Sequence, residues 1–174
     1  MGSSLSKVKT RLLPLTKENT PRWSIRGETL LVKVLEVHDG DTIHIAFSFN
    51  GKEYWDSLRV SGLDAPELAP RKKGRTEESL KTEKQFGRFS TEALKRKIRE
   101  SSPEGFIWVV FEPEDKYGRL LGTPFLLGRN SSRGENLTEW MLQENYALPY
   151  GGGTKETFNP LLYPKLQTEI DLTK

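Results

Sequence analysis

The chain has 174 residues, of which 34% are hydrophobic and 29% are charged, and its formal net charge is +3. This length fits one domain with a substantial core and excludes two domains of ordinary size. The absence of cysteine excludes disulfides and thiolate metal sites, and two histidines are too few for a histidine-rich zinc site. A metal in this protein would therefore have mainly oxygen ligands, which Ca²⁺ and Mg²⁺ prefer.

Residues 1–26 show no sustained hydrophobic period, and we expect a flexible basic arm there. They contain six cations and one anion, whereas the rest of the chain has a small excess of negative charge. The arm either binds an anionic partner, a membrane or a nucleic acid, or lies free in solvent. We see no apolar centre of a secretory signal and no bilayer-spanning stretch, so we expect an intracellular protein.

Gly2 fits the pattern for N-myristoylation, in which glycine follows the initiator methionine and serine or threonine stands at position 6. One acyl chain binds membranes weakly, and the nearby Lys7, Lys9 and Arg11 would supply a second signal. The start Met-Gly-Ser-Ser is also common in recombinant proteins. Two interpretations stay open: an acylated Gly2 that holds the protein at a membrane surface, and an unmodified start.

Alternating hydrophobic residues predict three antiparallel strands in meander order. The alternation runs over residues 30–34 and 43–49 and resumes over residues 54–60. Asp39-Gly40-Asp41 interrupts the first two strands. Asn50-Gly51 separates the second from the third, and Asn-Gly is the strongest two-residue hairpin signal because both residues tolerate a positive φ.

The next segments predict a loop, a helix and two further strands. Residues 68–82 are polar and basic, which indicates an exposed loop that either follows a nucleic-acid backbone or is simply solvated. A helix is expected to follow and to end near Ile98. Residues 106–111 are short, apolar and β-branched, typical of a buried strand, and residues 119–127 predict the fifth strand.

The last part of the chain predicts a second helix and a tail. Asn136 is placed to cap a helix that ends near Gln143, and the tail, residues 151–174, is expected to contain one short helix. The order of three strands, helix, two strands and helix predicts an α+β domain over residues 27–150. Its expected architecture is a five-stranded barrel of the oligonucleotide-binding (OB) type with two to three helices.

Three polar clusters are candidates for chemistry, although each alone is typical of a turn or surface loop. They are Asp39-Gly40-Asp41-Thr42, the segment from Arg59 to Asp64-Ala-Pro-Glu67, and Asp115-Lys-Tyr-Gly-Arg119. Together, in this order and on these strands, they resemble the staphylococcal nuclease (thermonuclease) family. Its hallmarks are Asp-Gly-Asp-Thr, Arg…Asp-x-Pro-Glu and Lys-Tyr-Gly-Arg. The resemblance covers about residues 32–150, and the expected barrel agrees with the fold of that family.

The resemblance implies a calcium site beside a catalytic acid. Asp41, Asp64 and the backbone carbonyl of Ala65 would bind Ca²⁺, and Glu67 would orient or deprotonate the attacking water. Ala65 stands where the family often has threonine, which changes little because the ligand is the backbone carbonyl. The chemistry is consistent: a hard cation polarises the phosphoryl oxygen, and Glu67 must lie near it without becoming a fixed ligand.

The resemblance also implies a pair of phosphate-binding arginines and a nucleotide-binding pocket. Arg59 and Arg119 would bind the scissile phosphate, since an arginine fork neutralises its charge bidentately. Lys116 and Tyr117 would line the nucleotide site, and Tyr150 takes the place of a substrate-contacting tyrosine. Base stacking on aromatic rings tolerates any sequence, so weak sequence preference is expected.

The expected function is a calcium-dependent nuclease that hydrolyses DNA and RNA with little sequence specificity. The resemblance implies 3′-phosphate ends, and we expect no obligate protein partner. The alternative is a catalytically inactive module of the same fold that binds nucleic acid or protein. Inactive members usually lack one or more of the acids or arginines, and this sequence retains all of them.

Overall fold

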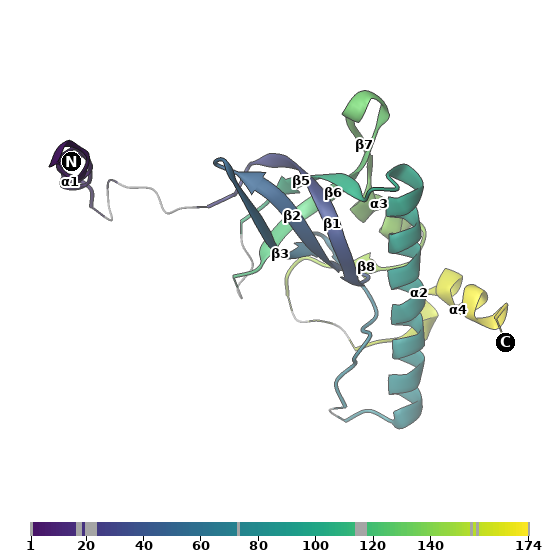
Figure 1. Cartoon of the computed structure of the whole chain (residues 1–174). Coiled ribbons are helices and arrows are strands. Elements are labelled where there is room, and N and C mark those ends of the chain that lie inside the picture. Colours follow the sequence, from purple (N-terminus) through teal and green to yellow (C-terminus); the bar gives the residue numbers. More distant parts are fainter. Residues whose placement is uncertain are drawn as a thin grey trace.

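A barrel with helices on one side forms the body of the molecule (Figure 1). The computed structural model describes residues 2–16, 19, 24–72, 74–113, 118–153, 155 and 157–173. The strands are β1 Thr29–Asp39, β2 Thr42–Phe49, β3 Lys52–Val60, β4 Leu63–Asp64, β5 Phe106–Phe111, β6 Leu120–Leu127, β7 Arg133–Asn136 and β8 Leu148–Pro149. The helices are α1 Gly2–Leu12, α2 Glu77–Ser101, α3 Leu137–Gln143 and α4 Pro164–Asp171, with 3₁₀ turns at Arg129–Ser131 and Pro160–Leu162.

The barrel closes because β6 pairs with strands on both of its sides. The hydrogen-bonded order is β3-β2-β1-β5-β6, and β6 also runs parallel to β3, with Arg59 opposite Leu121. The Asn50-Gly51 hairpin forms as predicted, with φ values of 52° and 75°. These strands confirm the α+β class and the five-stranded OB-type barrel, to which the small strands β4, β7 and β8 are added.

The barrel interior is filled by the inward residues of each alternating strand. In β5 the residues alternate strictly between buried and partly buried, so this strand has one core face rather than two. The side chains with at most 1% exposure in the barrel strands are Val32, Ile43, Ile45, Leu58, Ile107, Val109 and Phe111. Ile25 joins them, so the packed body includes a residue that the sequence analysis assigned to the N-terminal arm.

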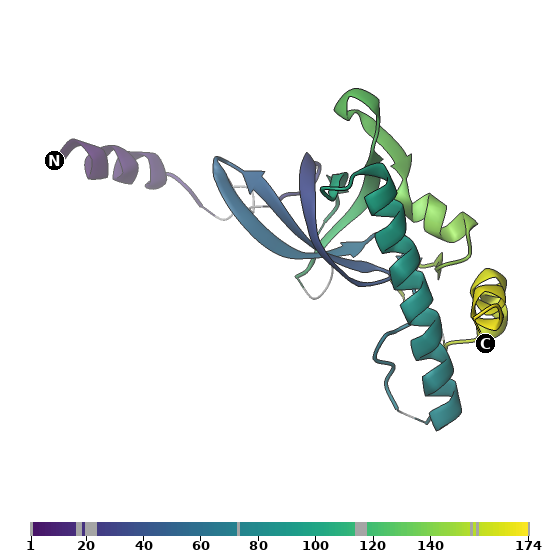
Figure 2. The ribbon, with the colours of Figure 1, turned by 45° about the vertical axis from the view of Figure 1, so that its right-hand side comes forward.

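Helix α2 lies between the barrel and α4 (Figures 1 and 2). It buries Phe86, Leu94 and Ile98. The prediction that residues 68–82 form an exposed loop is wrong in its second part, because α2 begins at Glu77. The Thr76 side chain accepts a hydrogen bond from the Ser79 amide, and two glutamates in the first turn favour the positive end of the helix.

The two chain ends differ in how they relate to the barrel. Residues 2–12 form α1, a helix that the sequence analysis did not predict, and it stands away from the barrel in both ribbon views (Figures 1 and 2). The tail contains the short helix that was predicted, α4, which buries Leu166 and Ile170 and packs against α2. No helix in the described part of the chain is long and apolar enough to span a membrane.

Candidate active site

The turn between β1 and β2 packs closely against α2 because Gly40 has no side chain. A Cβ atom on Gly40 would lie 2.6 Å from the Cβ of Ala65 and would also overlap the Ser90 hydroxyl of α2. The glycine is therefore required by close packing rather than by a positive φ. Asp39 accepts a hydrogen bond from the Asp41 amide at 3.1 Å, which orders the turn. This contact brings the turn, the Ala65 segment and the helix together.

Arg59 joins the two predicted metal-binding carboxylates. Its Nη1 lies 2.6 Å from Asp41 Oδ1, and its Nη2 lies 3.2 Å from Asp64 Oδ1. The guanidinium also donates to the carbonyls of Asp41 and Leu63, and its side chain is 11% exposed. The other oxygen of Asp41 accepts a hydrogen bond from the Ala65 amide at 3.1 Å. Asp41, Asp64 and Ala65, which the resemblance assigns to the metal, therefore lie close together, and the Arg59 guanidinium contacts both carboxylates.

A lysine from the C-terminal tail completes this cluster, and sequence reasoning missed it. Lys155 Nζ lies 2.8 Å from Asp64 Oδ1, 2.6 Å from Glu67 Oε1 and 3.4 Å from the Ala65 carbonyl oxygen. Nothing in the sequence marks Lys155, which stands in a glycine-rich segment and is remote from Glu67 along the chain. The ammonium lies among the oxygens that the resemblance assigns to calcium and its water.

Burial and charge shift the pKa values of three groups in this cluster. Desolvation, followed by the neighbouring Asp41 charge, raises the pKa of Asp39 to about 6. Burial also raises the pKa of Asp64, although Lys155 acts in the opposite direction. Burial disfavours the charged form of Lys155, but its hydrogen bonds to Asp64 and Glu67 outweigh burial and raise its pKa. Lys155 is therefore protonated and places a full positive charge next to Asp64 and Glu67.

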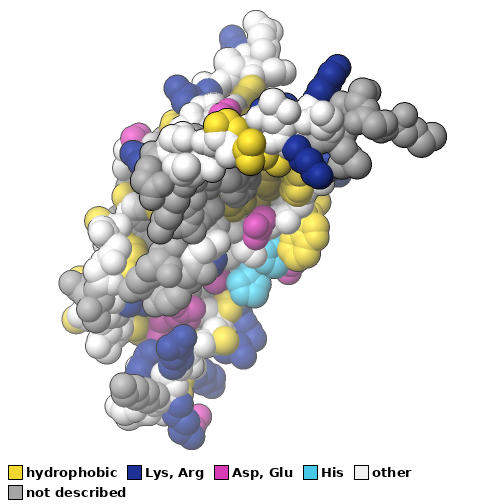
Figure 3. All heavy atoms as spheres, turned by 90° about the vertical axis from the view of Figure 1, so that its left-hand side faces the viewer, with side chains coloured by type: hydrophobic (Ala, Val, Ile, Leu, Met, Phe, Trp, Pro, Cys, Tyr) yellow, Lys and Arg dark blue, Asp and Glu magenta, His cyan; other side chains and the backbone are white. Residues whose placement is uncertain are grey.

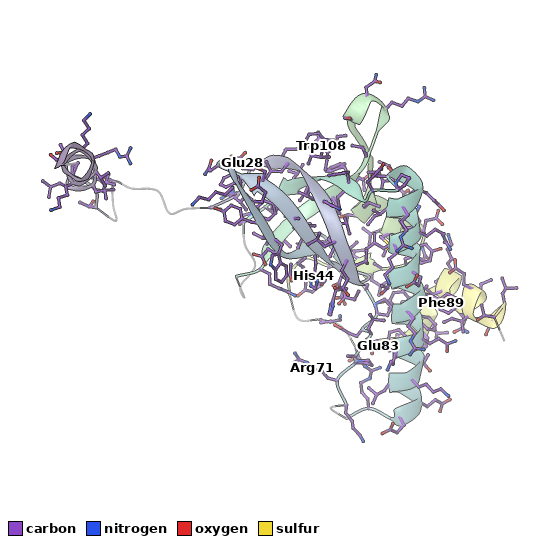
Figure 4. The ribbon with its side chains drawn as sticks, viewed as in Figure 1. Glu28, His44, Arg71, Glu83, Phe89 and Trp108 are labelled. Carbon is purple, nitrogen blue, oxygen red and sulfur yellow. The ribbon has the colours of Figure 1, made fainter. Side chains whose placement is uncertain are left out.

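A buried ion pair positions the segment that contains Glu67. Glu83 of α2 accepts a hydrogen bond from the Glu67 amide at 3.2 Å and forms a close ion pair with Arg75. Glu83 projects from α2 toward the loop, whereas Arg71 lies on the outer side of that loop (Figure 4). Arg75 lies in the segment that was predicted to be an exposed basic loop, and for this residue the prediction is wrong because its side chain is largely buried in the ion pair.

Arg119 directly precedes β6 and shares a face of the barrel with Arg59. Residues opposite each other in parallel strands point to the same side, and so do residues two apart in one strand. Since Arg59 lies opposite Leu121, Arg119 belongs to the same outer face. Lys116 and Tyr117 lie outside the described residues. Tyr150 is close to the cluster, with its ring centroid 5.9 Å from the Arg59 guanidinium carbon.

A pocket of about 240 Å³ opens next to Asp64 and Ala65. Its lining also includes Tyr150 and, from the tail, Lys155 and Phe158. The tail therefore builds part of the site, although the sequence analysis ended the domain at residue 150. The Tyr150 hydroxyl donates to the Gly153 carbonyl at 2.7 Å, which holds the beginning of the tail.

The oxygen atoms at this site fit a hard cation. A positive group, the Lys155 ammonium, already contacts a carboxylate and a backbone carbonyl that belong to the predicted ligand set. Among the described residues, no three His, Cys, Asp or Glu side chains are grouped so that they could hold a metal by themselves. A cation here would thus depend on the Ala65 carbonyl and on water besides the carboxylates, as is usual for Ca²⁺.

The two histidines lie on the barrel surface and stack on each other. Their ring centroids are 5.5 Å apart, and His44 also contacts the exposed Trp55 edge-to-face at 6.1 Å. Figure 3 shows the histidine side chains beside exposed hydrophobic ones on this face. The stack and the contact of His44 with Glu36 at 3.2 Å occupy the two rings in surface packing.

Comparison with protein families supports the nuclease-like assignment. The family model described as staphylococcal nuclease homologue matches residues 57–167, well over half of the chain. Among curated proteins, none matches the chain. The matched region contains Arg59, Asp64, Glu67, Arg119 and Lys155, and it begins after Asp41, so the place of Asp41 rests on the geometry above. The barrel and this match together show that the chain belongs to the staphylococcal nuclease family.

Proposed function

We propose that this protein is a calcium-dependent nuclease that hydrolyses DNA and RNA with little sequence specificity and leaves 3′-phosphate ends. One observation carries the proposal: Arg59 pairs with Asp41 and Asp64, and Lys155 bridges Asp64 to Glu67, in a member of a nuclease family. The family also includes inactive domains, and these usually lack part of the set of acids and arginines that is complete here.

The carboxylates have two different proposed roles, cation binding and proton acceptance. Asp41, Asp64 and the Ala65 carbonyl would hold the cation, which when bound polarises a phosphoryl oxygen and positions water. Glu67 has a 43% exposed side chain at the edge of the cluster, so that a water molecule can reach it. Its carboxylate would accept the proton as the water oxygen bonds to phosphorus. The bond from phosphorus to the 5′ oxygen breaks, and this oxygen takes a proton from solvent and leaves as a hydroxyl group.

The arginines neutralise the charge that gathers on the phosphoryl oxygens. Arg59 is held in place by Asp41 and Asp64, which reduces the entropy cost of binding the phosphate. Arg119, on the same outer face, would add a second fork. The Tyr150 ring, at the rim of the pocket, gives a base or sugar an aromatic surface to contact.

Cleavage of single-stranded DNA and RNA in calcium, and its loss in a chelator, is the first expected result. Labelled oligonucleotides of several sequences should be cut at similar rates, and mass spectrometry of the products should find 3′-phosphates. If no substrate is cut at any calcium concentration, but oligonucleotides bind without calcium and still bind Asp41→Ala, the inactive binding module is the correct description.

We further propose that α1 binds the surface of anionic intracellular membranes, with or without an acyl group on Gly2. The helix projects from the barrel, and Val8 and Leu12, one turn apart, are exposed. Figure 3, which views the side from which α1 projects, shows cationic and hydrophobic side chains exposed together at this end. An amphipathic basic helix of this kind lies in the membrane interface.

Removal of the α1 cations should weaken vesicle binding. Each lysine or arginine near an anionic surface contributes about 1 kcal/mol, so replacing Lys7, Lys9 and Arg11 by Gln should lower partitioning on the order of 100-fold. Sedimentation with phosphatidylserine-containing vesicles measures this. The matched control replaces three exposed α2 cations, Lys81, Lys84 and Arg88. Equal losses in both triple variants would contradict a specific role of α1, and mass spectrometry of the native N-terminus tests acylation.

A further inference from the structure

The segment from Gly151 to Asn159, here called the strap, crosses the acidic cluster and is anchored on both sides. Residues 154 and 156 of the strap are outside the described set. Before the strap, β8 pairs with β4, and the Tyr150 amide donates to the Gly62 carbonyl at 3.0 Å. At its end, the Phe158 ring packs on Phe86 of α2 with centroids 5.4 Å apart. The strap is therefore held across the site by contacts that do not involve Lys155.

Lys155 is the residue by which the strap contacts the acids. Its ammonium lies within 3.4 Å of three oxygens, one each from Asp64, Ala65 and Glu67. Two of these atoms belong to the proposed cation ligands, and the third belongs to the proposed proton acceptor. An ammonium and a divalent cation cannot share these oxygens, because both need them at contact distance and the two charges repel.

We propose that Lys155 is an internal counter-cation that must leave these oxygens before a divalent cation binds, and that it thereby sets the calcium requirement of the enzyme. This inference rests on the proposed function. While Lys155 is in place, the Glu67 carboxylate is paired and cannot serve as a free proton acceptor. The departure of Lys155 thus frees the cation-binding oxygens and the Glu67 carboxylate in the same event.

Competition for the same oxygens is reciprocal and separates this role from a purely structural one. If calcium displaces Lys155, loss of the lysine must strengthen calcium binding. A lysine that merely stabilises the strap gives the opposite result, because its loss would loosen the site and leave the calcium affinity unchanged or lower. The sign of the change in affinity therefore decides between the two roles.

The test is calorimetric titration of Ca²⁺ into the full chain and its variants. Lys155→Met should bind Ca²⁺ about 2- to 30-fold more tightly than the native chain, the range expected from removing two half-exposed ion pairs. Lys155→Arg retains the charge and should remain closer to the native affinity. Lys165→Met is the matched control: both lysines are 38% exposed, and Lys165 pairs with Glu144 away from the cluster.

A check of the fold and a second uncharged variant make the result interpretable. Circular dichroism checks the fold of each variant, and Lys155→Gln repeats the charge removal if Lys155→Met does not fold. Equal or weaker calcium binding by the uncharged variants would overturn the counter-cation role and leave the proposed calcium site intact. If neither the native chain nor any variant binds calcium, the proposed calcium dependence fails, and the counter-cation role fails with it.

Discussion

Glu67→Gln should fold normally and lose nearly all cleavage. The amide has almost the same shape as the carboxylate but cannot take a proton from water, and a positioned general base contributes about 10²- to 10⁴-fold to the rate. The Glu67 side chain is half-exposed, so its ion pair with Lys155 contributes little to stability. The free energy of unfolding should therefore change little. Single-turnover cleavage of a labelled oligonucleotide measures the effect.

Calcium must be saturating in this experiment, because the substitution also removes one partner of Lys155. Glu78→Gln, an exposed acid on the first turn of α2, provides the control and should cleave at the native rate. A Glu67→Gln rate within threefold of the native rate would remove Glu67 from the mechanism. A further arm with Lys155→Met and Glu67→Gln combined should cleave no faster than Glu67→Gln alone.

Glu83→Ala should lower the free energy of unfolding by about 3–5 kcal/mol, the usual cost of removing one partner of a buried ion pair. Glu83 is 3% exposed, and its loss leaves the Arg75 guanidinium without its counter-charge and the Glu67 amide without its acceptor. Urea denaturation monitored by tryptophan fluorescence gives the free energy. Cleavage should fall as well in the remaining folded protein, because the segment that contains Glu67 loses its anchor.

The control for this prediction is Glu78→Ala on the same helix, which should change stability by less than about 0.5 kcal/mol because the residue is exposed. The double variant Glu83→Ala with Arg75→Ala should recover part of the loss, since no charge is then buried alone. A loss below about 1 kcal/mol in Glu83→Ala, or no recovery in the double variant, would show that the pair has no structural role.

Helix α2 determines the geometry of the site although it provides none of the proposed catalytic groups. Glu83 holds the Glu67 amide, and Ser90 lies against Gly40. A Cβ atom on Gly87 would lie 2.8 Å from the carbonyl oxygens of Pro66 and Glu67, so the helix backbone also touches this segment directly. The acids therefore converge because two loops pack against one side of the same helix.

The sequence by itself determined the strands of the barrel and the local proximity of Asp64 and Glu67. Alternation predicted the strands because a half-buried strand must repeat every two residues, and Asn50-Gly51 predicted the hairpin from its φ preferences. Asp64 and Glu67 are three residues apart, so their proximity follows from local geometry. The role assigned to Asp41 came from the resemblance, and the Arg59 contacts then placed it in the cluster.

Only the tertiary structure decided which single polar residues reach the cluster from far along the chain. Lys155 and the Glu83–Arg75 pair have no local pattern, because one charged residue in a loop or a helix is ordinarily solvated. The early start of α2 was hidden for a related reason: its first turns are polar and lack a hydrophobic period. Periodic burial leaves a signal in the sequence, whereas a long-range contact between individual side chains appears only after the chain has folded.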